Sequence, residues 1–333
     1  MRYISTFRQQ LPKDLILRSV GQLVRYLCSN VPVVNTYACH AIERILTIKS
    51  GKDNLLTSAD FDPFLPHILT NTLAILQPTS TSPATGENEY AMKCLMRLCR
   101  SLQEKVTPYL DTVLATLNAL LGVVSKNPSK PNFNHYLFET LGVLVKAVCA
   151  SDRTRIATFE AHLFPVFNYV LEQDITEFIP YAFQLLSLML ELQAAASVPA
   201  VYFELFPFLL MPALWERPGY IPALTRLLQA YIEKAAGACV AEKILGVLGV
   251  FQRLIASKSN DHYAFYILSS LTEHMAPEVW GQYVRQVFVL MFQRLTSSKT
   301  TKLVKSMLVF FALYAHKYGC ANLMELIEGM QNG

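Results

Sequence analysis

Two places in this sequence hold residue types that could do chemistry. They are His40 with Glu43, and the short segment Ser50-Gly51-Lys52. A zinc protease helix needs two histidines one turn apart with a glutamate beside the first, and His40 is followed by Glu43 but by no second histidine at that spacing. Ser50-Gly51-Lys52 is similar to the end of a phosphate-binding loop, but the earlier glycine is absent and Asp53 stands where Ser or Thr would hold magnesium. We therefore predict that the chain is not an enzyme and has no catalytic residue, metal or cofactor.

The cysteines show neither a disulfide framework nor a metal-binding spacing. There are seven, an odd number, and no two form a Cys-x-x-Cys pair. Cys94 and Cys149 lie on or beside apolar helical stripes, which predicts buried thiols in a reducing compartment. The sequence also contains no Asn-x-Ser/Thr glycosylation acceptor. Both features favour the nucleus or cytosol over secretion.

The composition excludes a disordered chain and argues against nucleic acid as a partner. The sequence has 333 residues, 52% of them hydrophobic and 16% charged, which is enough for a large core. The formal net charge is only +4, and the lysines and arginines are spread along the chain. The longest apolar runs are shorter than the roughly 20 residues that span a bilayer. We expect no nucleic-acid binding and no membrane insertion.

Residues 87–148 show the plan on which the rest of the chain is built. In their middle, apolar residues recur at the three-then-four spacing that places them on one face of an α-helix. These residues are Leu110, Val113, Leu114, Leu117, Leu120, Leu121 and Val124. Narrower apolar stripes precede and follow, Thr107-Pro108 opens the middle helix and Asn127-Pro128 closes it. The pattern is that of a helical hairpin followed by the first helix of the next hairpin.

The same plan recurs along the chain. Helices are predicted over residues 13–28, 34–49, 64–76, 134–149, 157–172, 176–193, 200–214, 218–234, 238–256, 261–275, 279–295 and 301–318, with a last one beginning near residue 320. No run alternates apolar and polar residues at a period of two, so no sheet is expected. About eight helix pairs at a period of about 40 to 50 residues are typical of HEAT and armadillo repeats.

The predicted fold is therefore all-α, a right-handed α-solenoid of HEAT-type helical hairpins, with residues 1–333 forming a single array. Successive second helices are expected to form its concave surface. The sequence begins and ends within helical patterns, so we expect it to be cut from a longer protein at both ends.

Two glycines and two tryptophans are expected to serve packing. Gly246 and Gly249 lie within a helical apolar run and follow no strand, so they are expected to allow close helix contact and not to cradle a dinucleotide. Trp215 and Trp280 stand near helix ends beside prolines, where we expect them to pack at hairpin ends and not to form a ligand cage.

Six strings, in the same order along the chain, resemble the karyopherin-β family of exportins, in particular those that export importin-α. They are VVNTYACHAIERIL from Val33, ENEYAMKCLMR from Glu87, SKNPSKPNFNHYLFE from Ser125, LWERPGYIPALTRLLQAYIEK from Leu214, LGVFQRLIASKSNDHYAFYIL from Leu248 and MFQRLTSSKTTKLVKSMLVFF from Met291. The resemblance covers nearly the whole chain but only the middle-to-C-terminal part of those exportins. The family's amino-terminal repeats, which hold much of the Ran contact, have no counterpart in it.

The resemblance implies a binding function with no covalent chemistry. In the family, the solenoid wraps importin-α and the small GTPase Ran in its GTP form together in the nucleus, and GTP hydrolysis in the cytoplasm releases both. The chain is then expected to be part of a nuclear export receptor that shuttles between nucleus and cytoplasm and meets nuclear pore proteins. The alternative is a static HEAT-repeat scaffold without a nucleotide cycle, which periodicity alone would equally support.

Polar residues within the matched turns are the candidates for partner contacts. They are Lys126, Asn127, Lys130, Asn134, His135, Asn260, Asp261, His262, Lys299 and Lys302. The other role open to the Asn and Asp residues is helix capping and turn formation. The lysines either face an acidic partner or belong to a solvated outer face.

Overall fold

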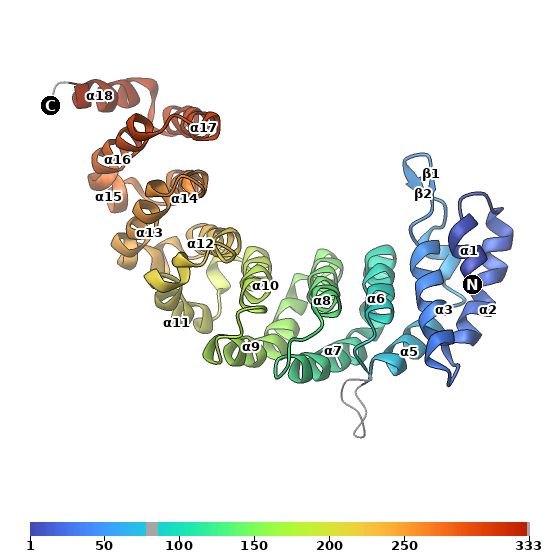
Figure 1. The fold of residues 1–333 in the computed structure, drawn as a ribbon. Coiled ribbons are helices and arrows are strands. Elements are labelled where there is room, and N and C mark those ends of the chain that lie inside the picture. The colour runs from blue at the N-terminus through green and yellow to red at the C-terminus, as the bar shows by residue number, and fades with distance from the viewer. Residues whose placement is uncertain (78–85, 332–333) are drawn as a thin grey trace. The chain divides into compact units, whose positions relative to one another are not determined.

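The computed structural model describes residues 1–77 and 86–331, which are built almost entirely of helices (Figure 1). The chain forms two compact units, Met1–Phe178 and Ile179–Gly333. The all-α fold predicted from periodicity is confirmed. Residues 78–86 are rich in Thr and Ser, which predicts a loop, but all except Gly86 lie outside the described residues.

The first unit contains helical hairpins and short connecting turns. Its described α-helices are α1 (Arg2–Phe7), α2 (Lys13–Leu27), α3 (Pro32–Ile45), α4 (Ser58–Phe61), α5 (Leu65–Leu76), α6 (Glu89–Leu102), α7 (Leu110–Val124), α8 (Pro131–Ser151) and α9 (Ile156–Glu172). The 3-10 segments η2 (Gln103–Tyr109) and η3 (Arg153–Arg155) connect some of them.

The second unit follows the same plan. Its described α-helices are α10 (Ile179–Leu192), α11 (Ala200–Leu209), α12 (Ile221–Lys234), α13 (Ile244–Ala256), α14 (Asp261–His274), α15 (Pro277–Trp280), α16 (Val284–Ser297), α17 (Thr301–Tyr318) and α18 (Cys320–Gln331). Short segments connect them, namely η4 (Ala195–Ser197), η5 (Pro212–Glu216), the π-helical η6 (Ala236–Val240), η7 (Ala241–Lys243) and η8 (Gly281–Tyr283).

Helix ends follow local capping chemistry. Helix α17 has the bounds predicted from the sequence because the Thr300 hydroxyl accepts a bond from Leu303 N at 3.1 Å, and because Gly319 leaves the helix with a φ of 93°. Helix α8 begins at Pro131, earlier than predicted, since proline is well suited to the first helical position. Helix α13 begins later than predicted, after η6 and η7.

Within each unit the helices form two rows (Figure 1). One row is α3, α6 and α8 in the first unit and α10, α12, α14 and α17 in the second; the other is α2, α5, α7 and α9, and α11, α13, α16 and α18. Neighbouring helices in the α3–α6–α8 row and in the α10–α12–α14–α17 row contact each other far more extensively than neighbouring helices in the two opposite rows. A stack curves towards the side on which its helices approach most closely, so these rows form the concave side of each unit.

These rows consist of the helices that are predicted from the sequence to be the first of each pair. In the structure α3, α6 and α14 pack on the helices before them, α2, α5 and α13, so the predicted pairing is offset by one helix and the second helix of each packed hairpin lies on the concave side. Small buried side chains allow close approach within these rows. Examples are Ala91 and Cys94 in α6 and Ala223 and Ala230 in α12. Proline and glycine mark the turns of a hairpin, but they do not reveal in which row neighbouring helices pack more closely.

Helices α6, α7 and α8 form the core expected from residues 87–148. The seven apolar residues of the α7 stripe are all at most 2% exposed. Burying each such Leu or Val stabilises the fold by roughly 1.5–3 kcal/mol relative to exposure. Each helix buries its stripe against helices before and after it, so none of the three would be stable alone.

One described stretch, Glu89–Val124, is long and apolar enough to cross a membrane by length and composition alone. Its most apolar window has a mean hydropathy of 1.3 and is 44% buried inside the chain. The stretch is not one continuous α-helix, because Gln103 has a φ of 49° and η2 separates α6 from α7. Core helices of soluble proteins pass the same test, so the stretch is weak support for a membrane span.

A minimal β-hairpin corrects the prediction that no sheet occurs. Strand β1 (Lys49–Ser50) pairs antiparallel with β2 (Asp53–Asn54), and Gly51 takes a φ of 65° in the turn. Glycine adopts this left-handed conformation without the steric cost of a side chain. Two residues per strand are too few to show a period of two in the sequence.

The packing predictions for glycine and tryptophan are largely confirmed. A Cβ at Gly246 would lie 2.9 Å from Cδ1 of Leu210, so the glycine permits close contact. At Gly249 a Cβ would meet nothing within 4 Å, and the packing prediction is wrong there. Trp215 and Trp280 are 3% and 0% exposed, and Trp215 Nε1 donates to the carbonyl of residue 209 at 2.8 Å.

Candidate partner-binding surface

The turn between α7 and α8 presents three of the predicted contact residues at the surface. Lys126, Asn127 and Lys130 are exposed, and Asn127 N donates to Val124 O at 3.1 Å, which fixes the turn. Lys130 Nζ lies 3.3 Å from Oε2 of Glu87, whose side chain is 8% exposed. The turn therefore holds two lysines and an amide on a well-defined backbone, an arrangement that suits an acidic or hydrogen-bonding partner.

Asn134 and His135, in the first turn of α8, differ in exposure. Asn134 is 4% exposed, and its Oδ1 has no hydrogen-bond partner among the described residues. His135 is exposed, with its ring centroid 5.4 Å from that of Tyr136. The Tyr136 ring also lies 5.3 Å from the ammonium of Lys93 in α6. Asn134 is thus an interior residue, whereas His135 extends the surface beside the turn.

Glu43 and Asn88 join α3 to α6, and neither was among the predicted contact residues. Glu43 is 3% exposed in its side chain, accepts from Arg97 Nε at 3.3 Å and lies 3.8 Å from Lys93 Nζ. Asn88 Oδ1 caps α6 by accepting from the N–H groups of residues 90 and 91, while Nδ2 donates to Thr36 Oγ1 at 2.7 Å. An Asn directly before an apolar stripe is a readable capping signal, but its bond to α3 depends on how the hairpins stack.

In the second unit, Asp261 forms a buried ion pair. Asp261 and Arg294 are 1% and 8% exposed, and Arg294 Nη2 donates to Asp261 Oδ2 at 3.0 Å. Arg294 Nη1 also donates to Ser297 Oγ at 3.1 Å. Asn260 precedes α14 and donates from Nδ2 to Ser257 Oγ at 3.2 Å. Asp261 therefore ties α14 to α16, and its carboxylate is not at the surface.

His262 and Lys302 lie close together where α14 meets α17. His262 is 7% exposed, and its ring centroid is 4.0 Å from that of Tyr263. Burial, and then the positive charge of Lys302, lower the pKa of His262, while Asp261 acts in the opposite direction. Lys302 and Lys299 are exposed, in and just before the first turn of α17. The exposed Lys302 thus lies beside a neutral, mostly buried imidazole.

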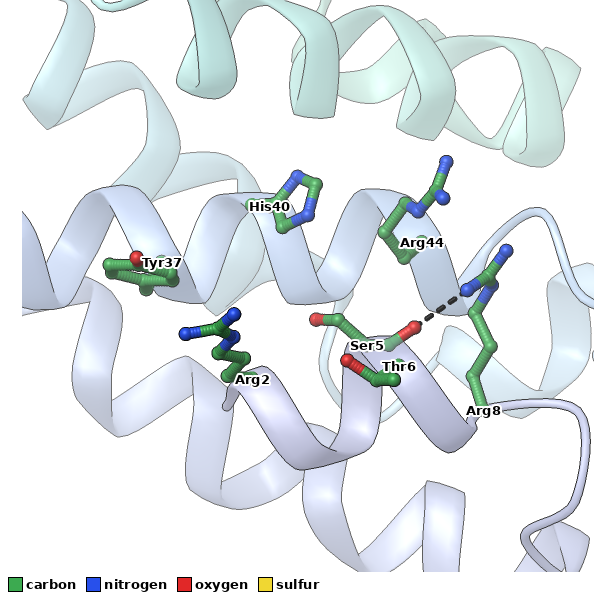
Figure 2. Close-up of a pocket in the computed structure, with 7 residues that line it drawn as sticks. All are labelled: Arg2, Ser5, Thr6, Arg8, Tyr37, His40 and Arg44. Carbon is green, nitrogen blue, oxygen red and sulfur yellow. Dashed lines mark hydrogen bonds between the residues drawn. The ribbon is translucent and has the colours of Figure 1, made fainter.

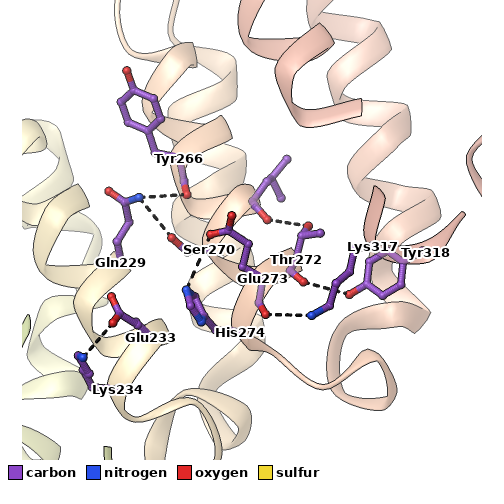
Figure 3. A network of polar contacts seen from close by, with 11 residues as sticks. Gln229, Glu233, Lys234, Tyr266, Ser270, Thr272, Glu273, His274, Lys317 and Tyr318 are labelled. Atoms are coloured by element: carbon purple, nitrogen blue, oxygen red, sulfur yellow. Dashed lines mark hydrogen bonds and ion pairs between the residues drawn. The ribbon is translucent and has the colours of Figure 1, made fainter. Parts of the chain in front are cut away.

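Tyr263 and Tyr266 add an aromatic surface that sequence reasoning missed. Their ring centroids are 5.8 Å apart at an interplanar angle of 83°, and Tyr266 is 47% exposed. Gln229 of α12 donates to the Tyr266 carbonyl at 3.4 Å and to Ser270 Oγ at 3.2 Å (Figure 3). The spacing of His262 and Tyr266, one helical turn apart, is the signal that could have revealed this cluster.

Polar contacts near the last turn of α14 connect it to α17 (Figure 3). Lys317 Nζ donates to the Glu273 carbonyl at 3.3 Å, and the Tyr318 hydroxyl donates to the Thr272 carbonyl at 3.5 Å. Carbonyls at a helix C-terminus have no partner within their own helix, and a cation there also complements the helix dipole. These bonds therefore fix the spacing between the two helices.

The buried thiols serve packing. Cys28 and Cys320 are exposed free thiols and the other five free cysteines are buried, so the predicted burial of Cys94 and Cys149 is confirmed. Burial raises the pKa of Cys99 to about 12 and that of Cys149 to about 11, which keeps both protonated at neutral pH. Within residues 1–77 and 86–331, no group of three or more His, Cys, Asp and Glu side chains is placed to hold a metal ion.

Comparison with known proteins gives a consistent match. The family model described as CAS/CSE protein, C-terminus, matches residues 43–333. Exportin-2 of Oreochromis niloticus is 49% identical over 336 residues, which cover 99% of this chain and 34% of the relative. Exportin-2 of Homo sapiens is 48% identical over 336 residues with the same coverage. The chain thus spans about a third of the length of the curated relatives it matches.

Solved structures show the same arrangement of helices. The exportin Cse1 in its cargo-free, cytoplasmic state matches with a TM-score of 0.88 and 33% identity, over 98% of this chain and 34% of that one. Yeast importin-β (Kap95p) matches with a TM-score of 0.71 over 99% of this chain and 39% of that one. At 16% identity, the second similarity concerns the fold alone.

Proposed function

The chain belongs to the CAS/CSE family, and from this premise we propose that it is part of a nuclear export receptor that binds importin-α together with Ran-GTP and returns importin-α to the cytoplasm. The observation that carries this proposal is the 49% identity to Exportin-2 across 99% of the chain. Because the chain spans 34% of that relative, we assign to it a share of the partner-binding surface and not the complete transport cycle. Such a receptor shuttles between nucleus and cytoplasm and meets nuclear pore proteins on the way.

Coupled binding, without covalent chemistry, is the proposed mechanism. Each ligand stabilises an arrangement of repeats that improves the site for the other, and the coupling must be equal in both directions. Small rotations between many hairpins add up to a large change. Interior contacts such as Glu43–Arg97 and Asp261–Arg294 hold neighbouring helices in register while such rotations occur.

Residues at the surface of three turns are the proposed contacts. The exposed ones are Lys126, Asn127, Lys130 and His135 at the α7–α8 turn and Lys299 and Lys302 at the α16–α17 turn, and the half-buried Asn260 precedes α14. We assign a supporting role to Asn134, Asp261 and His262, because their side chains are at most 7% exposed. The lysines favour acidic surfaces on the partner, which would also accelerate association.

Calorimetric titration of importin-α into the 333-residue chain, with and without GTP-loaded Ran, tests the proposal. Full-length exportin serves as the positive control. We expect heat of binding that is much larger in the presence of Ran-GTP. Equal binding with and without Ran-GTP would instead support a static scaffold. If no heat of binding appears under either condition while the full-length control binds, the importin-α site lies outside this chain.

A charge reversal tests the assigned surface. Lys302→Glu is expected to weaken Ran-dependent binding by about fivefold, the effect of about 1 kcal/mol at an exposed charge. Lys243→Glu, a reversal at another exposed position of the second unit, serves as the matched control and should have no effect. Equal losses in both variants would indicate a general charge effect and would refute the contact assignment.

A further inference from the structure

A basic pocket lies between α1 and α3 (Figure 2). It has a volume of about 600 Å³. Its lining residues are Arg2, Ser5, Thr6, Arg8, Tyr37, His40 and Arg44. Helix α1 packs on α3, which belongs to the concave row of the first unit and is separated by α6 from α8, where the proposed contacts of that unit lie.

Three guanidinium groups and no carboxylate line this pocket. Within the described part of the chain, Arg2, Arg8 and Arg44 form no ion pair with an acidic side chain. Arg8 Nη1 donates to the Ser5 carbonyl at 2.6 Å, which orients its guanidinium and leaves its other N–H groups available (Figure 2). The pocket therefore carries positive charge that the chain itself does not neutralise.

The surrounding charges do not cancel this positive field. Glu43 lies next to the pocket on α3, but its carboxylate is already engaged by Arg97 at 3.3 Å and Lys93 at 3.8 Å. The pKa of His40 is lowered first by burial and further by the charges of Arg44, Lys93 and residue 8, against an opposing effect of Glu43. Burial is thus the main cause of the lowered pKa, and the positive charge of the pocket rests on its three arginines.

The size and spacing of the lining suit an extended ligand. Tyr37, His40 and Arg44 share one face of α3, and seven residues of helix correspond to about 10 Å of length. A volume of about 600 Å³ exceeds what a single carboxylate or phosphate fills. Guanidinium forks bind carboxylates through two parallel hydrogen bonds, and the exposed hydroxyl of Thr6 can bond to a main chain, whereas that of the buried Ser5 already donates to the Met1 carbonyl at 3.3 Å.

We propose that this pocket binds an acidic peptide segment of a protein partner. The inference rests on the proposed function as a receptor for proteins, and it names the chemistry of one partner segment. A peptide is favoured over single-stranded nucleic acid because base recognition needs aromatic platforms for stacking. The pocket offers one exposed phenol ring, Tyr37, which is 46% exposed.

Fluorescence anisotropy with a labelled ten-residue oligoglutamate and the 333-residue chain tests the pocket at low ionic strength. The double variant Arg2→Gln with Arg44→Gln is expected to weaken binding by about tenfold or more, because two charge-assisted contacts are lost. Arg18→Gln with Arg25→Gln removes two charges from exposed positions on α2, outside the pocket, and should change binding by less than about twofold.

A second variant separates guanidinium recognition from charge alone. Arg44→Lys keeps the charge but loses the planar fork, so we expect a weakening smaller than that of the double variant but larger than that of the α2 control. Circular dichroism confirms that each variant retains its helices. Equal weakening by the pocket and α2 variants would overturn the site, as would full binding by Arg44→Lys together with full binding by the double variant.

The ligand class has its own control. Tighter binding of a labelled decathymidylate or of inositol hexakisphosphate than of oligoglutamate would overturn the peptide assignment. The assay contains neither importin-α nor Ran, so absence of oligoglutamate binding to the unaltered chain refutes the pocket alone. Conversely, oligoglutamate binding with no Ran-dependent importin-α binding upholds the pocket and counts only against the importin-α-binding role assigned to this chain.

Discussion

Removing the carboxylate of Asp261 is expected to destabilise the second unit strongly. In Asp261→Ala, Arg294 remains 8% exposed and keeps its charge, but it loses the acceptor at 3.0 Å. At that distance the Coulomb attraction is about 5.5 kcal/mol for an effective dielectric constant of about 20. Desolvation offsets most of this energy in the intact pair, yet the cost of desolvating Arg294 remains after the substitution. We expect the free energy of unfolding to fall by about 3 kcal/mol, the lower end for a broken buried pair, because the bond to Ser297 persists.

Tryptophan fluorescence during urea unfolding measures this change selectively. Both tryptophans of the chain, Trp215 and Trp280, are buried in the second unit, whereas circular dichroism reports on both units. Glu216→Ala is the matched control: it breaks an Arg253–Glu216 pair of the same 3.0 Å length whose side chains are 41% and 64% exposed. Its expected effect is below about 1 kcal/mol. If the two variants lower stability equally, burial does not decide the strength of these pairs and the reasoning fails.

Four further predictions concern the thiols, two glycines and one lysine. Ellman's reagent at pH 8 should modify Cys28 and Cys320 rapidly and the other thiols only after unfolding; rapid modification of more than two would contradict their burial. Burial raises the pKa of the Cys99, Cys149 and Cys239 thiols from 9.0 to about 11 or 12. Their contribution to the free energy of unfolding is therefore complete below pH 9 and is lost as the pH rises towards those values, which urea unfolding between pH 8 and 11 would detect. Gly249→Ala should stabilise the second unit by about 0.5–1 kcal/mol, since its Cβ meets open space, and Gly246→Ala should gain less because of the contact at 2.9 Å; equal gains would argue against that contact. Replacing Lys302 with Gln should raise the pKa of the neighbouring imidazole at position 262, as followed by NMR titration, and an unchanged pKa would mean that burial alone lowers it.

Helix positions are predictable where local chemistry marks them. The bounds of α17 follow from Thr300 before the helix and Gly319 after it, and Pro131 marks the start of α8. These signals act within one helical turn, so a single sequence contains them in full. The apolar stripes are equally readable, since a stripe on one face of a helix must find a neighbour.

The contacts that build the candidate sites are not readable in this way. His262 and Asp261 look like surface residues because they are polar and follow a turn, but stacking of the next hairpins buries them. The pairing of Asp261 with Arg294 spans 33 residues, and the pocket joins Arg2 of α1 to Arg44 of α3. Such contacts depend on the angle and offset between helices, which the side chains of many residues set together.

The uneven packing of the two rows gives each unit a mechanical direction. Close-packed interiors resist compression, so the row containing α6 and α8, like that containing α10 and α12, keeps a nearly constant length under load. The sparser contacts on the side of α7 and α9 allow neighbouring helices to separate at lower cost. When a unit bends, the spacing of helices therefore changes little in the close-packed row and changes mainly in the opposite row. A partner bound along α3, α6 and α8 meets a surface on which the distances between helices change little, while the far side lengthens or shortens.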